Sequence, residues 1–76
     1  MDPKMVAGVP LDQFEARLQC RVGGRVRDLR VELHGGALVL RGWARTYYAK
    51  QLAQHAAMEA TALPILANDI EVHELG

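Results

Sequence analysis

The side chains best suited to chemistry in this chain are its arginines and its single tryptophan. Residues 17–50 carry eight basic side chains against two acidic ones, although the net charge of the whole chain is zero. Guanidinium groups bind carboxylates and phosphates, and tryptophan joins them at interface hot spots and lipid headgroups. This chemistry is the recognition of an anionic partner. The same asymmetry also fits a solvated basic face that an acidic face balances after folding.

A β-hairpin closed by Gly35-Gly36 would bring several of these side chains onto one face. With a two-residue turn, Arg30 is expected opposite Arg41. By the same count, Asp28 is expected opposite Trp43. Like charges that face each other across a sheet are unfavourable unless something offsets them. Either neighbouring carboxylates or a bound anionic partner could do so, and Trp43 either contacts that partner or packs over the sheet edge.

The candidate binding surface therefore combines cationic, aromatic and aliphatic side chains of the hairpin and of the segment after it. Its members are Arg30, Val39, Arg41, Trp43, Arg45 and Tyr47. Arg25, Arg27 and Tyr48 lie close to it in sequence and could extend it, although Tyr48 is expected to pack at the corner between sheet and helix. The surface predicts binding rather than catalysis.

The sequence contains no recognisable catalytic or metal-binding pattern. His34, His55 and His73 belong to no metal-ligand spacing, and Cys20 is the only cysteine. We interpret Cys20 as a buried structural thiol, and His55 with Glu59 as a surface pair one helical turn apart. Without a nucleophile–base pair or a carboxylate dyad, we expect no catalytic residue, no metal site and no cofactor.

One helix and two long strands must position the candidate surface. Apolar residues at helical spacing predict a first helix from Leu11 to Val22, which Gly23-Gly24 ends. Alternating apolar residues on both sides of the glycine turn predict strands over 26–34 and 37–44. The register sets one apolar face, on which the expected pairs are Leu29–Gly42, Val31–Leu40 and Leu33–Leu38.

A second helix and a third strand complete the predicted fold. Thr46 is the expected N-cap of a helix over about 47–62, which Pro64 ends. The inward residues of a last strand over 66–73 are expected to be Leu66, Ile70 and Val72. Residues 37–44 are apolar on both faces, which favours them as the central strand, with the last strand parallel beside them after a right-handed connection. The predicted class is α+β, with the order αββαβ and both helices on one face of a three-stranded sheet.

Residues 1–10 are expected to be a flexible N-terminal tail, and residues 11–76 a single domain. The chain has no apolar run long enough to cross a membrane, and its first residues lack the charged-then-apolar pattern of a signal peptide. We therefore expect a cytoplasmic location, with which a single cysteine agrees.

The segment 29–72 resembles a BON domain, the small module named for bacterial osmotically induced and nodulation proteins. The resemblance rests on alternating valines and leucines, a glycine turn, and a strand ending in leucine-x-glycine at residues 36–42. A capped helix and a closing strand follow, with matching residues Leu63, Leu66, Asn68, Ile70 and Val72. The glycine of the family before the third strand is replaced here by residues 62–64. The resemblance implies an αββαβ fold and a non-enzymatic role, usually in phospholipid or protein binding and often in the bacterial envelope.

Three functions are open on the sequence alone. The first is contact with an anionic phospholipid surface or a protein partner through the candidate binding surface. The second is self-association into a homo-oligomer, since a three-stranded sheet has two edges and one uncovered face. The third, nucleic-acid binding, has the least support, because the chain is not basic overall and has few aromatic side chains for base stacking.

Overall fold

The computed structural model describes residues 5–6 and 8–73, which form two helices, a three-stranded sheet and a short N-terminal strand pair. The elements are β1 (Met5–Val6), β2 (Val9–Pro10), α1 (Leu11–Val22), the 3₁₀ turn η1 (Gly23–Arg25), β3 (Val26–His34), β4 (Ala37–Ala44), α2 (Tyr47–Ala60) and β5 (Ile65–Val72). The predicted bounds of α1, β3 and β4 are confirmed, whereas α2 and β5 end slightly earlier than predicted.

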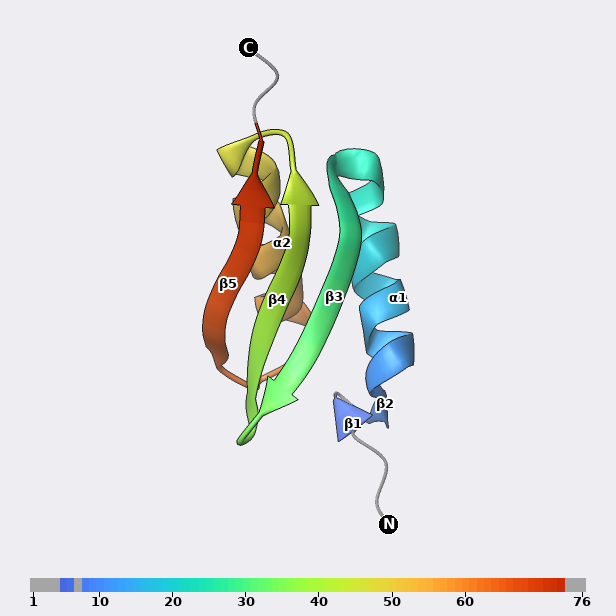
Figure 1. Cartoon of the computed structure of the whole chain (residues 1–76). Coiled ribbons are helices and arrows are strands. Elements are labelled where there is room, and N and C mark those ends of the chain that lie inside the picture. Colours follow the sequence, from blue (N-terminus) through green and yellow to red (C-terminus); the bar gives the residue numbers. More distant parts are fainter. Residues whose placement is uncertain (1–4, 7, 74–76) are drawn as a thin grey trace.

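The main sheet has the order β3-β4-β5, with β4 in the centre (Figure 1). β3 and β4 are antiparallel, whereas β4 and β5 are parallel and are joined through α2. Figure 1 shows α2 behind the strands and α1 alongside β3, and the connection from β4 to β5 is right-handed. The α+β class and the αββαβ order of the domain are therefore confirmed.

The two helices contribute apolar side chains of different size to the core. α1 buries Phe14, Leu18 and Val22 at helical spacing against the sheet. α2 buries only alanines, which allow its backbone to lie close to the strands: Ala49, Ala53, Ala56 and Ala57. Thr46 caps α2 as predicted, because its hydroxyl accepts a hydrogen bond from the Ala49 N–H at 3.0 Å.

The hairpin keeps the predicted register from His34–Ala37 to Arg30–Arg41 and then departs from it at a β-bulge. Asp28 has a positive φ of 52°, and the next partners are Arg27 with Trp43. The predicted pairs of Leu29 with Gly42 and of Asp28 with Trp43 are therefore wrong, because the bulge inserts a residue into β3.

Gly42 is required opposite this bulge. Its φ is 154°, and a Cβ atom there would lie 2.9 Å from the Arg27 carbonyl oxygen. Such a contact is closer than carbon and oxygen tolerate, so a larger residue would push the two strands apart. The leucine-x-glycine pattern of β4 thus serves the bulge in β3.

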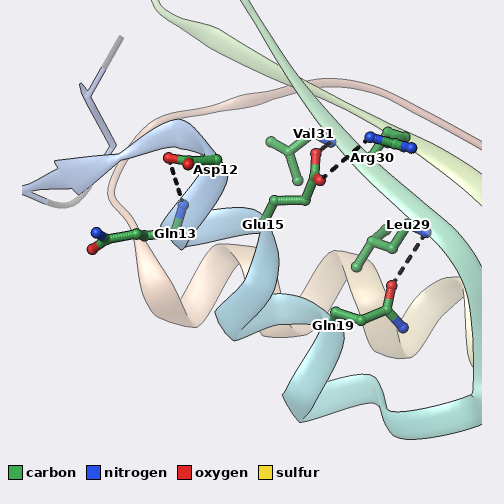
Figure 2. Close-up of polar contacts among 7 residues, drawn as sticks. All are labelled: Asp12, Gln13, Glu15, Gln19, Leu29, Arg30 and Val31. Atoms are coloured by element: carbon green, nitrogen blue, oxygen red, sulfur yellow. Dashed lines mark hydrogen bonds and ion pairs between the residues drawn. The ribbon is translucent and has the colours of Figure 1, made fainter. Parts of the chain in front are cut away.

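Side chains of α1 form hydrogen bonds with backbone groups at the outer edge of β3. Figure 2 shows Glu15 and Gln19 reaching from the helix to the strand. The Glu15 carboxylate accepts from the Val31 N–H at 2.9 Å, and the Gln19 amide oxygen accepts from the Leu29 N–H at 3.3 Å. The Gln19 amide nitrogen also donates to the Val26 carbonyl at 2.9 Å. This edge is therefore hydrogen-bonded to the protein's own side chains.

Three sequence predictions about individual residues are wrong. Val6 is 1% exposed and belongs to the core, so it is not part of a flexible tail as predicted; residues 1–4 and 7 lie outside the described part of the chain. Cys20 is exposed rather than buried, since it lies off the buried stripe of α1. Leu66 is 63% exposed, because a register shift between Leu38 and Val39 turns Ile65 toward the core in its place.

Candidate anion-binding site

Three arginines converge where β3 begins and β4 ends. The Cα pairing of Val26 with Ala44 sets Arg25, Arg27 and Arg45 around one point of the sheet. All three side chains are exposed. The bulge contributes to the cluster, because it places Arg27 rather than Asp28 opposite Trp43. We call Arg25, Arg27 and Arg45, together with Trp43 and Tyr48, the arginine cluster.

Two aromatic side chains border these arginines. Trp43 is 44% exposed, and its ring packs against the His73 ring with centroids 4.7 Å apart. Two open hollows of about 200 and 590 Å³ adjoin the three arginines, the first lined also by Trp43 and the second by Tyr48. An anionic group could lie in either hollow beside the guanidinium groups, which bind carboxylate and phosphate oxygens.

The charges of the arginine cluster have no counter-ion within the described residues. No carboxylate of residues 5–6 and 8–73 lies within 4.0 Å of the guanidinium groups of Arg25, Arg27 or Arg45. Like charges brought together in this way repel one another, and a bound anion would relieve the repulsion. The cluster is thus electrostatically suited to an anionic partner.

The two arginines that the sequence placed at the centre of the binding surface are both paired. Arg30 and Arg41 are cross-strand partners as predicted. However, the Arg41 Nε lies 2.9 Å from the Glu32 carboxylate, and the Arg30 guanidinium lies 3.9 Å from Glu15 of α1. Carboxylates of the protein thus offset the facing charges without a ligand, which is the first of the two explanations given above.

The remaining members of the predicted surface differ in exposure and in whether they line the two hollows. Val39 is only 6% exposed and offers little contact area, although it lies on the outer face of β4. Tyr47 is 61% exposed but does not line either hollow. Tyr48 is 67% exposed, so the expectation that it packs at the sheet–helix corner is wrong. Of the six predicted residues, Trp43 and Arg45 belong to the arginine cluster.

Two of the three histidines lie beside carboxylates at the surface. His34 lies 2.8 Å from Glu32, and His73 lies 3.7 Å from Glu71. The hydrogen bond with His34, followed by the charge of Arg41, lowers the pKa of Glu32 below its ordinary value of 4.5. Glu59 pairs with Arg21 of α1 at 3.3 Å, not with His55 as predicted.

Two features of the described residues bear on other kinds of site. In residues 5–6 and 8–73, no three metal-ligating side chains come close enough together to hold an ion. Within the same ranges, neither helix has the length and apolar character needed to cross a lipid bilayer.

Comparisons with known proteins gave no relative for this chain: no protein-family model, no curated protein and no solved structure matches it.

Proposed function

We propose that this chain is a non-catalytic binding domain whose arginine cluster contacts an anionic phospholipid surface. The observation that carries the proposal is the convergence of Arg25, Arg27 and Arg45 beside two exposed aromatic rings, with no carboxylate of the described residues in ion-pair contact. The resemblance of residues 29–72 to a BON domain supports the same function.

The chemistry of the arginine cluster fits a lipid headgroup region. Guanidinium groups bind phosphate oxygens with two parallel hydrogen bonds, and remain charged at every physiological pH. Tryptophan and tyrosine favour the boundary between water and lipid, because each has an apolar body and one polar group. Trp43 and Tyr48 would enter the boundary while the arginines hold phosphates beside them.

Binding to vesicles tests this proposal directly. We expect the protein to co-sediment with vesicles that contain phosphatidylglycerol but not with pure phosphatidylcholine vesicles, and to bind less at physiological than at low salt. The fluorescence of Trp43 should shift to shorter wavelength on binding. Since each basic residue near an anionic membrane contributes about 1 kcal/mol, replacing Arg25, Arg27 and Arg45 by glutamine should weaken binding about 100-fold.

A second triple variant, Arg17→Gln with Arg30→Gln and Arg41→Gln, removes the same charge from outside the arginine cluster and serves as the control. Equal losses in both variants would mean that binding depends on net charge alone. A larger loss in the control would return the binding surface to the centre of the hairpin. Binding to a single-stranded oligonucleotide but not to vesicles would favour nucleic acid as the anionic partner.

A further inference from the structure

The outer edge of β5 is open, in contrast to that of β3. β5 ends the sheet, and no other strand of the described residues pairs with its far side (Figure 1). The N–H of His73 donates to the Ala44 carbonyl of β4 at 2.8 Å. Because backbone groups alternate in direction along a strand, the peptide groups of Asn68, Ile70 and Val72 point to the open side.

Only one of these three N–H groups has a partner among the described residues. The Ile70 N–H donates to the Asn68 side-chain oxygen at 3.3 Å. The side-chain nitrogen of Asn68 is itself held by α2, since it donates to the Lys50 carbonyl at 3.0 Å and to the Gln54 side chain at 3.2 Å. The backbone of β5 therefore presents further donors and acceptors in a straight row beside α2.

A hollow with mixed polar and apolar walls adjoins the start of this row. It has a volume of about 380 Å³ and lies between α2 and β5, with walls formed by Gln54, Met58, residues 61–64 and Ile65. Met58, which lines the hollow, is 57% exposed, and Leu66 of β5 is 63% exposed. The hollow can accept one large apolar side chain from a strand added to β5.

The outer face of β5 is acidic. Asp69 and Glu71 are exposed and follow each other on that face, opposite Arg41 and Trp43 of β4. Asp69 forms no ion pair with any described residue, and Glu71 contacts only His73, at 3.7 Å. A second copy of β5 placed antiparallel on this edge would bring its own carboxylates close to these two. Charge therefore favours a basic strand over self-association.

We propose that the open edge of β5 and the neighbouring hollow bind an extended, basic segment of another protein by β-strand addition. The backbone of that segment pairs with Asn68 and Val72, its basic side chains face Asp69 and Glu71, and an apolar side chain on its opposite face enters the hollow beside Met58. This site adjoins the arginine cluster at Glu71, which is the Cα partner of Trp43, but its backbone contacts and the hollow do not depend on the proposed membrane contact.

The probe for this site is a seven-residue peptide of alternating lysine and leucine with blocked ends. We expect it to bind with the amide signals of Asn68 and Val72 shifted in NMR spectra and with slower hydrogen exchange at those two positions. The same peptide with glutamate in place of lysine should not bind. N-methylation of every second peptide amide, on the side that faces β5, should abolish binding, because the added strand then lacks its donors.

Two variants locate the contacts without altering the core. Asp69→Asn with Glu71→Gln should weaken the lysine peptide about 10-fold, since two cross-strand charge pairs are lost. Asp12→Asn with Glu59→Gln removes the same charge elsewhere and should leave affinity unchanged. Met58→Glu should also weaken binding by placing a charge beside the hollow.

Four results would overturn the proposal. The first is the absence of binding at millimolar peptide. The second is equal binding of the lysine and glutamate peptides. The third is signal shifts confined to the arginine cluster. The fourth is protection of Asn68 and Val72 that grows with protein concentration in the absence of peptide, because that result would assign the edge to a second copy of this chain.

Discussion

The two edge strands of the sheet, β3 and β5, differ in how far side chains of the helices bond to their outward backbone groups. At β3, Glu15 and Gln19 of α1 accept hydrogen bonds from the outward N–H groups of Val31 and Leu29, and Gln19 donates to the Val26 carbonyl. At β5, α2 bonds to the Asn68 side chain rather than to the strand backbone, and the adjoining surface contains a hollow with mixed walls. Exposed edge strands invite pairing with other chains, so proteins usually cover or interrupt them. Side-chain hydrogen bonds cover part of the β3 edge. The open β5 edge is therefore the more informative of the two about binding to another chain.

The largest expected loss of stability comes from a substitution at Gly42, opposite the bulge of β3. Gly42→Ala places a Cβ 2.9 Å from the Arg27 carbonyl, and we expect the free energy of unfolding to fall by about 3 kcal/mol. Urea denaturation measures the change. Gly24→Ala is the control, because its added Cβ meets no atom within 4 Å. Similar losses for both variants would contradict the close packing described for Gly42.

Opening the β3 edge is the next test. Gln19→Ala removes hydrogen bonds to the Leu29 N–H and to the Val26 carbonyl, and should destabilise the fold by about 2 kcal/mol. Hydrogen exchange at Leu29 should become faster, while exchange at Val72 stays the same. Gln13→Ala, at an exposed position of the same helix, should change neither quantity. If Gln19→Ala also left Leu29 protected, the edge would not depend on α1.

A smaller loss of stability is expected at the N-terminus of α2, the helix that connects β4 to β5. Thr46→Ala removes the hydroxyl that accepts from the Ala49 N–H, at a cost of about 1 kcal/mol. Thermal unfolding measures this loss, and Thr46→Ser should recover most of it because the acceptor returns. An equal effect of serine and alanine would show that the methyl group of Thr46, not its hydroxyl, stabilises α2.

The smallest expected effect concerns the pKa of Glu32, on the outer face of the sheet. The pKa of Glu32 is lowered in the folded chain, so its stabilising contribution is complete above 4.5 and is lost as pH falls through the lowered value. His34→Ala should return the Glu32 pKa toward 4.5, because it removes the largest cause of the shift. Carboxyl NMR titration reads this directly, and an unchanged pKa would assign the shift to Arg41.

Sequence patterns predicted most of the fold and little of the site. Apolar spacing and the glycine turn were sufficient for α1, β3 and β4, because burial and positive φ leave few alternatives. The bulge at Asp28 could not be predicted, since aspartate tolerates a positive φ without requiring it. The arginine cluster depends on that bulge, so the sequence alone centred the candidate surface on Arg30 and Arg41 instead.

The covered edge was also beyond prediction from one sequence. Glu15 and Gln19 are polar residues of an amphipathic helix, and their types do not distinguish a solvated side chain from one that binds a neighbouring strand. Leu66 shows the opposite difficulty. Its alternation with Ile70 and Val72 predicted burial, but a register shift in the parallel pair left it exposed.

The parallel pairing of β5 with β4 has a consequence for how the chain reaches its fold. His34 pairs with Ala37 across only two glycines, so the hairpin can form early from neighbouring residues. Ala44 meets Val72 only after α2 has been crossed. Non-local contacts of this kind form late, because the intervening loop must be closed first. Until then β4 is itself an unpaired edge, rich in valine and leucine, and this interval is when newly made chains are most exposed to aggregation.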